Sequence, residues 1–383
     1  MQYRFIRSTM VTSVKRIALF APANCTENSG AIGDTILQTS FVRTLLDHCL
    51  FPELEVVHWW GADWVVNQLF QDLSPRVEAH VWNGALDTIP APETILLHDV
   101  SIAFICTRNE AVTSAIRAAL PSIPCYVPRM PLNAQSSVHL CRQLHTCLED
   151  LGLSIPDVPR PRIIVTGDDL KAGNEDLTIQ NLKHVSTERT AGKESFNVAF
   201  DKLFLVSPSL GQEEDRRTWL LGTWRRLAYL LGNVGPVIVA YKPDDRFERR
   251  GAEEVVLGEP SFWPRFAIGL TLRDLAVLAC ASTACVARDS GPMHVAAAAA
   301  SPVGRASVIG LVSVFNPETW RPLSDDFEAM GRWPLPLEDC VRPEEVAVRA
   351  AAIAKRTFAV PPAGPPNMAL HPSAAGATVS GRG

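Results

Sequence analysis

The residues best suited to chemistry gather in one stretch around residue 289. The apolar run Cys285–Ala287 is typical of a buried strand, and Asp289, Ser290 and Gly291 are turn residues. Gly291 can serve as N-cap, with Pro292 at the first helical position of an alanine-rich helix. A helix start after a strand attracts phosphate through its N–H groups and its dipole. An ordinary capped turn between strand and helix fits the same spacing.

A carboxylate occupies a comparable position near the N-terminus. An apolar run over 17–20 and a polar loop over 21–31 precede Gly33 and Asp34, which open a helix. Leu37, Phe41 and Leu45 then recur at helical spacing. Asp34 suits the first turn because its charge complements the helix dipole. Its plain interpretation is therefore a helix-start carboxylate, and its alternative is a general base.

Strands and helices alternate in both halves of the chain. We expect strands over 17–20, 54–59, 77–81, 94–97, 102–106, 123–127, 203–206, 237–241, 285–287 and 306–314. We expect helices over 33–46, 62–70, 111–120, 136–151, 219–231, 244–255, 272–281 and 344–357. Thr271 and Asp274 predict a near capping box at the start of one of them. This alternation predicts parallel sheets with helices on both faces.

Composition narrows the class of protein. The 383 residues suggest two domains, and 47% hydrophobic residues can fill a core in each. A net charge of -5 argues against nucleic-acid binding. Nine cysteines without a C-x-x-C pair favour reduced thiols over disulfides or a zinc site. No signal peptide or transmembrane run is evident, so we expect a cytoplasmic protein, with peripheral membrane contact left open.

Four segments together resemble one enzyme family. They are Asp289-Ser290-Gly291-Pro292-Met293-His294, Gly33-Asp34, Arg217-Thr218-Trp219 and Val314-Phe315-Asn316-Pro317-Glu318. The first resembles the signature of glycosyltransferase family nine, the ADP-heptose heptosyltransferases of lipopolysaccharide synthesis. The others resemble that family's Gly-Asp, Lys-x-Trp and Phe-Gly-Pro-Thr segments. The resemblance implies a GT-B fold, in which two Rossmann-like domains face each other across a cleft.

The resemblance also implies roles for individual residues. The donor is a nucleotide sugar, with ADP-heptose favoured, and its leaving diphosphate gains charge as the glycosidic bond breaks. Backbone N–H groups of Ser290, Gly291 and Met293 would stabilise that charge together with Arg217. Asp34, across the cleft, would deprotonate the acceptor hydroxyl. The remaining donor-side candidates are Asp245 for a ribose, Asp289 for orienting the turn, and Pro292 and His294. No metal and no cofactor beyond the donor are expected.

The same layout sets the expected domains. We expect an N-terminal lead-in (1–14), an acceptor-side Rossmann-like domain (15–160), a linker or flexible insertion (161–200), a nucleotide-sugar-binding domain (201–340), a helix that crosses back to the N-terminal domain (341–360) and a disordered tail (361–383).

The sequence departs from the family pattern and leaves alternatives open. Asn316 stands in place of a glycine, Ser40 in place of a proline, and Arg217 in place of a lysine. Asn316 can still reach the left-handed region.

The acceptor could be a lipid-linked saccharide, a protein or a small metabolite. A nucleotide-sugar 2-epimerase and a non-catalytic sugar-nucleotide-binding protein remain as rival hypotheses. Lone histidines such as His139 and His145 are expected to carry no chemistry.

Overall fold

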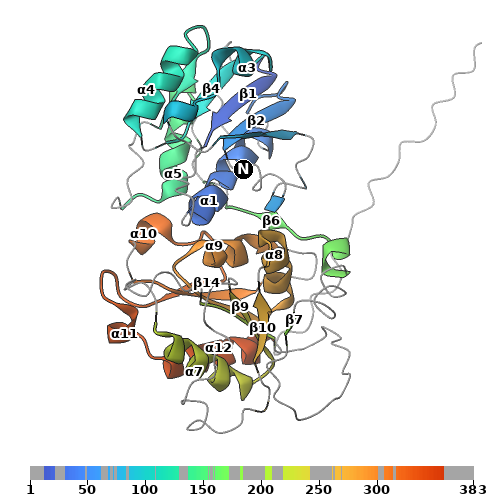
Figure 1. The fold of residues 1–383 in the computed structure, drawn as a ribbon, viewed down its shortest axis with the longest axis vertical. Helices are drawn as coiled ribbons and strands as arrows, with labels where there is room; N and C mark the ends of the chain where they lie inside the picture. Colours follow the sequence, from blue (N-terminus) through green and yellow to red (C-terminus); the bar gives the residue numbers. More distant parts are fainter. Residues whose placement is uncertain are drawn as a thin grey trace, which may run out of the picture.

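Over its described residues the chain forms two large β-sheets, one in each half, with mostly parallel strands and with helices on both faces of each (Figure 1). This computed structural model describes residues 13–21, 31–47, 50–61, 68–69, 72, 76–82, 86–107, 109–128, 137–153, 155, 158, 160–171, 182–183, 203–208, 219–241, 261, 264–268, 270–300, 306–313 and 316–357. The predicted α/β class and the GT-B layout of two Rossmann-like sheets are confirmed.

The N-terminal sheet has five parallel strands over the described residues, in the order β3-β2-β1-β4-β5. Their bounds are β1 Arg16–Phe20, β2 Val56–Gly61, β3 Val77–Val81, β4 Ile102–Ile105 and β5 Cys125–Tyr126. Helix α1 (Ala31–Asp47), helix α5 (Leu140–His145) and the 3-10 helix η3 (Thr146–Leu151) share one apolar cluster with alternate strand residues. Helices α3 (Pro92–Leu96) and α4 (Glu110–Ala119) pack on the opposite face, after the 3-10 turn η2 (Leu86–Thr88).

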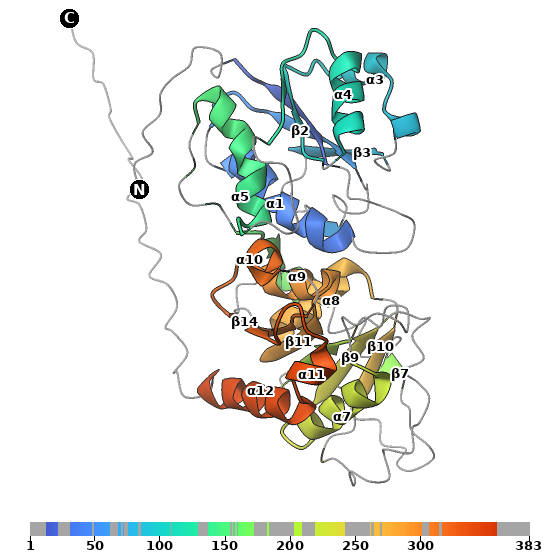
Figure 2. The same cartoon turned by 90° about the vertical axis from the view of Figure 1, so that its left-hand side faces the viewer.

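The C-terminal sheet has seven strands over the described part of the chain, in the order β14-β13-β11-β8-β9-β10-β7. They are β7 Leu182–Lys183, β8 Phe204–Ser207, β9 Val237–Tyr241, β10 Arg265–Ile268, β11 Ala284–Arg288, β13 Ser307–Leu311 and β14 Phe327–Met330; β7 alone among them is antiparallel. Helices α8 (Leu272–Ala281) and α9 (Gly291–Ala298) lie on the face toward the N-terminal half (Figure 2). Helices α7 (Leu221–Gly232) and α12 (Pro343–Thr357) cover the other face, and α10 (Pro317–Trp320) and α11 (Leu337–Cys340) are short.

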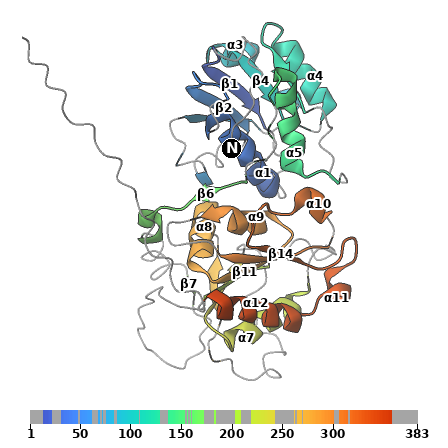
Figure 3. The ribbon, with the colours of Figure 1, turned by 180° about the vertical axis from the view of Figure 1, so that it is seen from behind.

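Two short strands of the expected linker belong to sheets. Strand β6 (Ile163–Ile164) pairs in parallel with β12 (Ala299–Ala300), directly after α9. Figures 1 and 3 view the molecule from opposite sides, and β6 lies between the two halves in both. Strand β7 adds an antiparallel edge to the C-terminal sheet. Much of the rest of 161–200 lies outside the described residues, as do the expected helix 244–255 and the tail 361–383.

The final helix does not cross back to the N-terminal domain, so that prediction is wrong. Its apolar face, which includes Val346, Ala350 and Ile353, packs in one cluster with α7 and the C-terminal sheet. Two of its partners are the fully buried Trp224 and Leu227 of α7. The apolar stripe of α12 therefore completes the core of the C-terminal half.

Two other elements differ from expectation because of local chemistry. Residues 94–97 were expected to form a strand, but Pro92 opens the short helix α3 there. The helix expected over 136–151 begins at Leu140, because the side chain of His139 caps it by accepting a hydrogen bond from the N–H of Cys141.

One apolar cluster runs through both halves of the molecule. It includes Leu19 of the N-terminal sheet, Leu37 and Phe41 of α1, Met293 of α9 and Cys285 of the C-terminal sheet. Helix α1 is buried over most of its described length, including its polar residues. A helix buried all round lies in a core rather than at a surface. Helix α1 therefore belongs to the junction of the two halves as much as to its own sheet.

Candidate functional site

The first turn of α1 meets the first turn of α9, so the two sequence motifs lie side by side (Figure 2). A Cβ atom added to Gly33 would lie 2.9 Å from Cδ2 of His294. A Cβ atom added to Gly291 would lie 2.6 Å from Cβ of Ile32. Each helix thus presents a glycine to a side chain of the other. These glycines allow close approach of two helices from different halves.

The start of α9 differs by one residue from the expectation. Ser290 is the N-cap, with φ −162° and ψ 174°, and Gly291 and Pro292 are the first two helical residues. The Ser290 hydroxyl donates to the Arg288 carbonyl oxygen at 3.2 Å instead of capping the helix. The N–H of Met293 donates to the Ser290 carbonyl at 3.1 Å. That N–H is used within the turn, so its predicted role at the diphosphate has no support here.

Met293 and Gly291 have packing roles that the sequence did not reveal. Met293 is fully buried, and its sulfur would lie 2.7 Å from a Cβ atom on Gly310 of β13. Met293 is therefore a core residue beneath the helix start. Gly291 contacts Ile32 rather than open space. Because Gly291 has no side chain, Ile32 of α1 can approach the start of α9 closely.

Buried polar residues follow the carboxyl ends of the central C-terminal strands. Ser207 ends β8, Arg288 ends β11 and is followed by Asp289, and Ser313 follows β13. The N–H of Asp289 donates to the Leu311 carbonyl at 3.0 Å, which fixes this turn to the neighbouring strand. The hydroxyl of Ser313 is buried without a hydrogen-bond partner among the described residues. Ligands of open α/β sheets bind at this edge.

The sequence interpretation missed Ser207, Arg288 and Ser313. Each lies at or just beyond the carboxyl end of an apolar strand run, and that position is the signal that could have found them.

His294 is held as a neutral imidazole. It is buried, and desolvation, followed by the nearby His139, lowers its pKa to about 3. Its Nδ1 has no hydrogen-bond partner among the residues that the structure describes. A buried polar atom of this kind is costly unless a ligand or a water meets it. The ring therefore has unused hydrogen-bonding capacity at the junction of the two halves.

His139 ties the halves together at a second point. While its Nδ1 caps α5, its Nε2–H donates to the Arg321 carbonyl at the end of α10, at 2.8 Å. Burial lowers the pKa of His139, which favours the neutral ring that can donate and accept at once. The sequence predicted only that His139 carries no chemistry. The two hydrogen bonds give it a structural role, which that prediction did not address.

Asn316 does not use the left-handed region. Its backbone is extended, with φ −62° and ψ 114°, and its side-chain oxygen accepts from the N–H of Glu318 at 3.0 Å. Asparagine is a strong N-cap residue, so it starts α10 in place of the glycine typical of the family pattern.

Three candidate residues cannot be placed as side chains. Asp34 lies in the first turn of α1, beside Gly33, but its side chain is outside the described part of the chain. Arg217 and Asp245 lie wholly outside it. Asp289, Ser290, Gly291, Pro292, Met293 and His294 are described and lie together at the start of α9.

A family model matches part of the chain. Residues 166–347 match the model of glycosyltransferase family 9 (heptosyltransferase). The chain carries a glycosyltransferase family 9 domain. That domain contains the Asp289 turn and Asn316, whereas Asp34 precedes it. No curated protein has a matching sequence.

Solved structures share the fold of this chain over most of its length. E. coli ADP-heptose LPS heptosyltransferase II is 16% identical with a TM-score of 0.62, covering 90% of this chain and 99% of that chain. A family 9 glycosyl transferase from Veillonella parvula DSM 2008 is 16% identical with a TM-score of 0.64, covering 91% and 99%. E. coli heptosyltransferase WaaC with ADP is 13% identical with a TM-score of 0.54, covering 88% and 99%. Within the described residues, no helix has the length and apolar character needed to cross a membrane.

Proposed function

We propose that this glycosyltransferase moves heptose from ADP-heptose to an acceptor hydroxyl, with inversion at the anomeric carbon. The family 9 domain and the likeness to heptosyltransferases support the reaction class. One of the similar structures is a heptosyltransferase with ADP, which favours an adenine nucleotide in the donor.

The meeting of the α1 and α9 helix starts carries this proposal. Gly33 contacts His294, so the backbone of Asp34 lies one residue away from a contact with the donor motif. Both helix starts favour negative charge through their dipoles. A carboxylate on one side and a diphosphate on the other would therefore be accommodated at the same junction. An acceptor hydroxyl between them would have its base and its electrophile close together.

The chemistry follows from these positions. The acceptor oxygen attacks the anomeric carbon while Asp34 takes its proton, and the bond from that carbon to the diphosphate oxygen breaks. The departing ADP gains a negative charge, which the N–H groups of Ser290 and Gly291 and the guanidinium of Arg217 would stabilise. Asp289 would orient the turn, and Asp245 would bind the ribose. These groups require no cofactor and no catalytic metal.

The acceptor side is proposed only as a class. A glycan, a protein or a small molecule with an accessible hydroxyl would serve, in the cytoplasm or at the surface of its membrane. Lipopolysaccharide core saccharides are the first choice, because E. coli LPS heptosyltransferase II shares the fold.

Replacement of Asp34 by Asn tests the proposal. Asp34→Asn keeps the size and much of the helix-start preference but removes the base, so turnover should fall by about 10² or more. Melting temperature and ADP affinity should stay close to those of the wild type. The measurement is the initial rate of ADP release from ADP-heptose with a lipopolysaccharide core saccharide, beside a melting curve and an ADP titration.

A matched control is Asp168→Asn, which removes a carboxylate whose side chain is 97% exposed. It should leave turnover unchanged. Full activity in Asp34→Asn, with a loss of up to about 1 kcal/mol in stability, would show that Asp34 only starts a helix. ADP binding without turnover of any sugar nucleotide by the wild type would favour a non-catalytic binding protein.

A further inference from the structure

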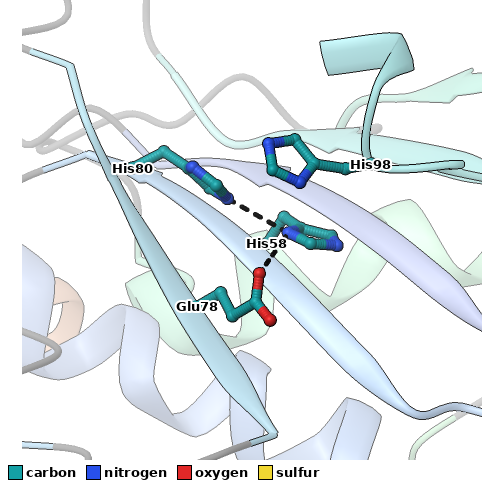
Figure 4. A group of neighbouring side chains, drawn as sticks. All are labelled: His58, Glu78, His80 and His98. Carbon is teal, nitrogen blue, oxygen red and sulfur yellow. Dashed lines mark hydrogen bonds and ion pairs between the residues drawn. The ribbon is translucent and has the colours of Figure 1, made fainter. Parts of the chain in front are cut away.

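Three histidines and a glutamate form a cluster on the N-terminal sheet (Figure 4). His58 lies on β2, Glu78 and His80 lie on β3, and His98 follows α3. The register pairs His58 with Glu78, and the side chains of residues 78 and 80 point to the same face because strands alternate. Sheet register thus gathers donor groups that are far apart in the sequence.

The cluster lies on the sheet face opposite to α1. Trp60, two residues after His58 on β2, belongs to the apolar cluster of the α3 and α4 face. Val57 and Trp59, which alternate with His58 and Trp60, belong to the cluster that contains α1. The sheet therefore separates this histidine cluster from the proposed glycosyl-transfer site.

The ligand atoms are close enough to share one ion. One nitrogen or oxygen atom from each of the four residues lies within 4.8 Å of all the others. Nδ1 of His58 is 3.0 Å from Nε2 of His80 and 3.3 Å from Oε2 of Glu78. In a tetrahedral zinc site with bonds of about 2.0–2.1 Å, the edges between ligand atoms are about 3.3 Å. Two edges of the cluster already have nearly this length.

Packing holds the histidine rings in place. His80 stacks on Trp60 with ring centroids 4.3 Å apart and an interplanar angle of 18°. The ring of His98 lies 4.5 Å from that of His58 and 4.4 Å from that of His80. Nη1 of Arg16 donates to the main-chain oxygen of His98 at 3.2 Å, which fixes the turn. Rings restrained in this way lose little freedom when they bind a metal.

The burial pattern suits a metal with access from solvent. His58 is 2% exposed, whereas Glu78 is exposed and His80 and His98 are half-buried. Nε2 of His58 has no hydrogen-bond partner among the described residues, so the polar contacts of this ring are at Nδ1, facing the cluster. An ion could therefore enter past Glu78 and bind against the buried ring.

We propose that His58, Glu78, His80 and His98 bind a divalent transition metal of the zinc class. Imidazole nitrogens and one carboxylate are ligands that Zn²⁺ takes readily, and four protein ligands make a closed, structural site. The ion would fasten β2, β3 and the turn after α3 to one another. It would stabilise the N-terminal sheet without taking part in glycosyl transfer, so the proposal stands apart from the function proposed above.

Metal titration of the full-length chain tests this assignment. After treatment with a chelator and removal of that chelator, the protein is titrated with Zn²⁺ in a calorimeter and with Co²⁺ in a spectrophotometer. We expect one Zn²⁺ per chain, displacement of Co²⁺ by Zn²⁺, and the visible absorption of four-coordinate Co²⁺. Saturating Zn²⁺ should raise the melting temperature, because a ligand that binds only the folded state stabilises it.

Single-ligand variants identify the site. His80→Ala and Glu78→Gln change residues that are not fully buried, and each should weaken Zn²⁺ binding by at least about 10-fold. His139→Gln removes a histidine outside the cluster and should leave Zn²⁺ affinity unchanged. Circular dichroism of each variant confirms that it folds before titration.

The contrary outcomes are distinct. No Zn²⁺ binding by the wild type would show that the four residues are only a packed, hydrogen-bonded cluster. Binding that survives in both His80→Ala and Glu78→Gln would place the metal elsewhere and overturn the assignment. ADP release measured with and without the chelator distinguishes a structural ion from a catalytic one, and we expect equal rates at a temperature where both forms are folded.

Discussion

Adding one methyl group to Gly291 is a direct test of the contact between α1 and α9. In Gly291→Ala the new Cβ would lie 2.6 Å from Cβ and 2.7 Å from Cγ2 of Ile32. Both distances are far below van der Waals contact, and one of the two atoms on Ile32 is bound directly to the backbone. Side-chain rotation therefore cannot relieve the overlap, and the two helices must move apart.

The size of the effect follows from two opposing contributions. Overpacking in a tight core costs about 1–3 kcal/mol. Replacing glycine by alanine also restricts the unfolded chain, which stabilises the protein by about 0.4–1 kcal/mol where the site accepts it. We expect a net loss of about 1–2 kcal/mol. At a typical unfolding entropy per residue, this lowers the melting temperature of a 383-residue chain by about 1–3 °C.

Gly167→Ala is the matched control, because a Cβ at Gly167 meets nothing within 4 Å. It should raise the melting temperature slightly. The double variant Ile32→Gly/Gly291→Ala removes the side chain that causes the overlap. In a double-mutant cycle, the two changes should show a favourable coupling of about 1 kcal/mol or more.

Scanning calorimetry of Gly291→Ala, Gly167→Ala, Ile32→Gly, the double variant and the wild type provides the data. Additive effects, together with a Gly291→Ala variant as stable as Gly167→Ala, would refute the reasoning. They would mean that α1 and α9 do not touch in solution as they do in this structure.

Two further predictions concern the neutral histidine and a helix cap. Burial holds the pKa of His294 at about 3, so below pH 6.5 the unfolded chain binds a proton that the folded chain does not. The free energy of unfolding of the wild type should therefore fall relative to that of His294→Gln as the pH drops from 6.5, by up to about 1.4 kcal/mol per pH unit. Urea unfolding of both proteins at several pH values measures this difference. A difference that stays constant with pH would contradict the prediction. The capping box of Thr271 and Asp274 is present at the start of α8. Thr271→Ala should therefore lower the free energy of unfolding by about 0.5–2 kcal/mol, whereas Thr271→Ser should keep most of the wild-type stability, as thermal unfolding would show. Equal losses in both variants would contradict the capping argument.

Local patterns in the sequence predicted most of the elements. The apolar run before Gly33 is a strand, the stripe of Leu37, Phe41 and Leu45 is buried, and the capping box at Thr271 is present. Each depends on residues within one or two turns of each other. The turn at Asp289 was recognised for the same reason, although its helix begins one residue earlier than expected.

Most of the features that were missed depend on residues distant in sequence; helix α3 is the exception, because its signal is local. Residues 94–97 look like a strand by composition, but the preceding Pro92 and the short length favour helix α3. The contact of Gly33 with His294 depends on how two halves dock, which no local pattern records. The histidine cluster depends on the register of β2 with β3 and on the turn that brings His98 over them. The alternation of Glu78 and His80 along one strand was its single local signal.

The apolar cluster that runs from one sheet through α1 and α9 to the other has a consequence for folding. If it is intact, neither half can unfold without exposing an apolar face of its neighbour, so thermal unfolding should be one cooperative transition. A chain cut between residues 155 and 160 should give two fragments that aggregate when made alone, since each would expose part of this cluster. The same fragments made together should associate and restore the fold. The two halves would then behave as complementing parts of a single folding unit.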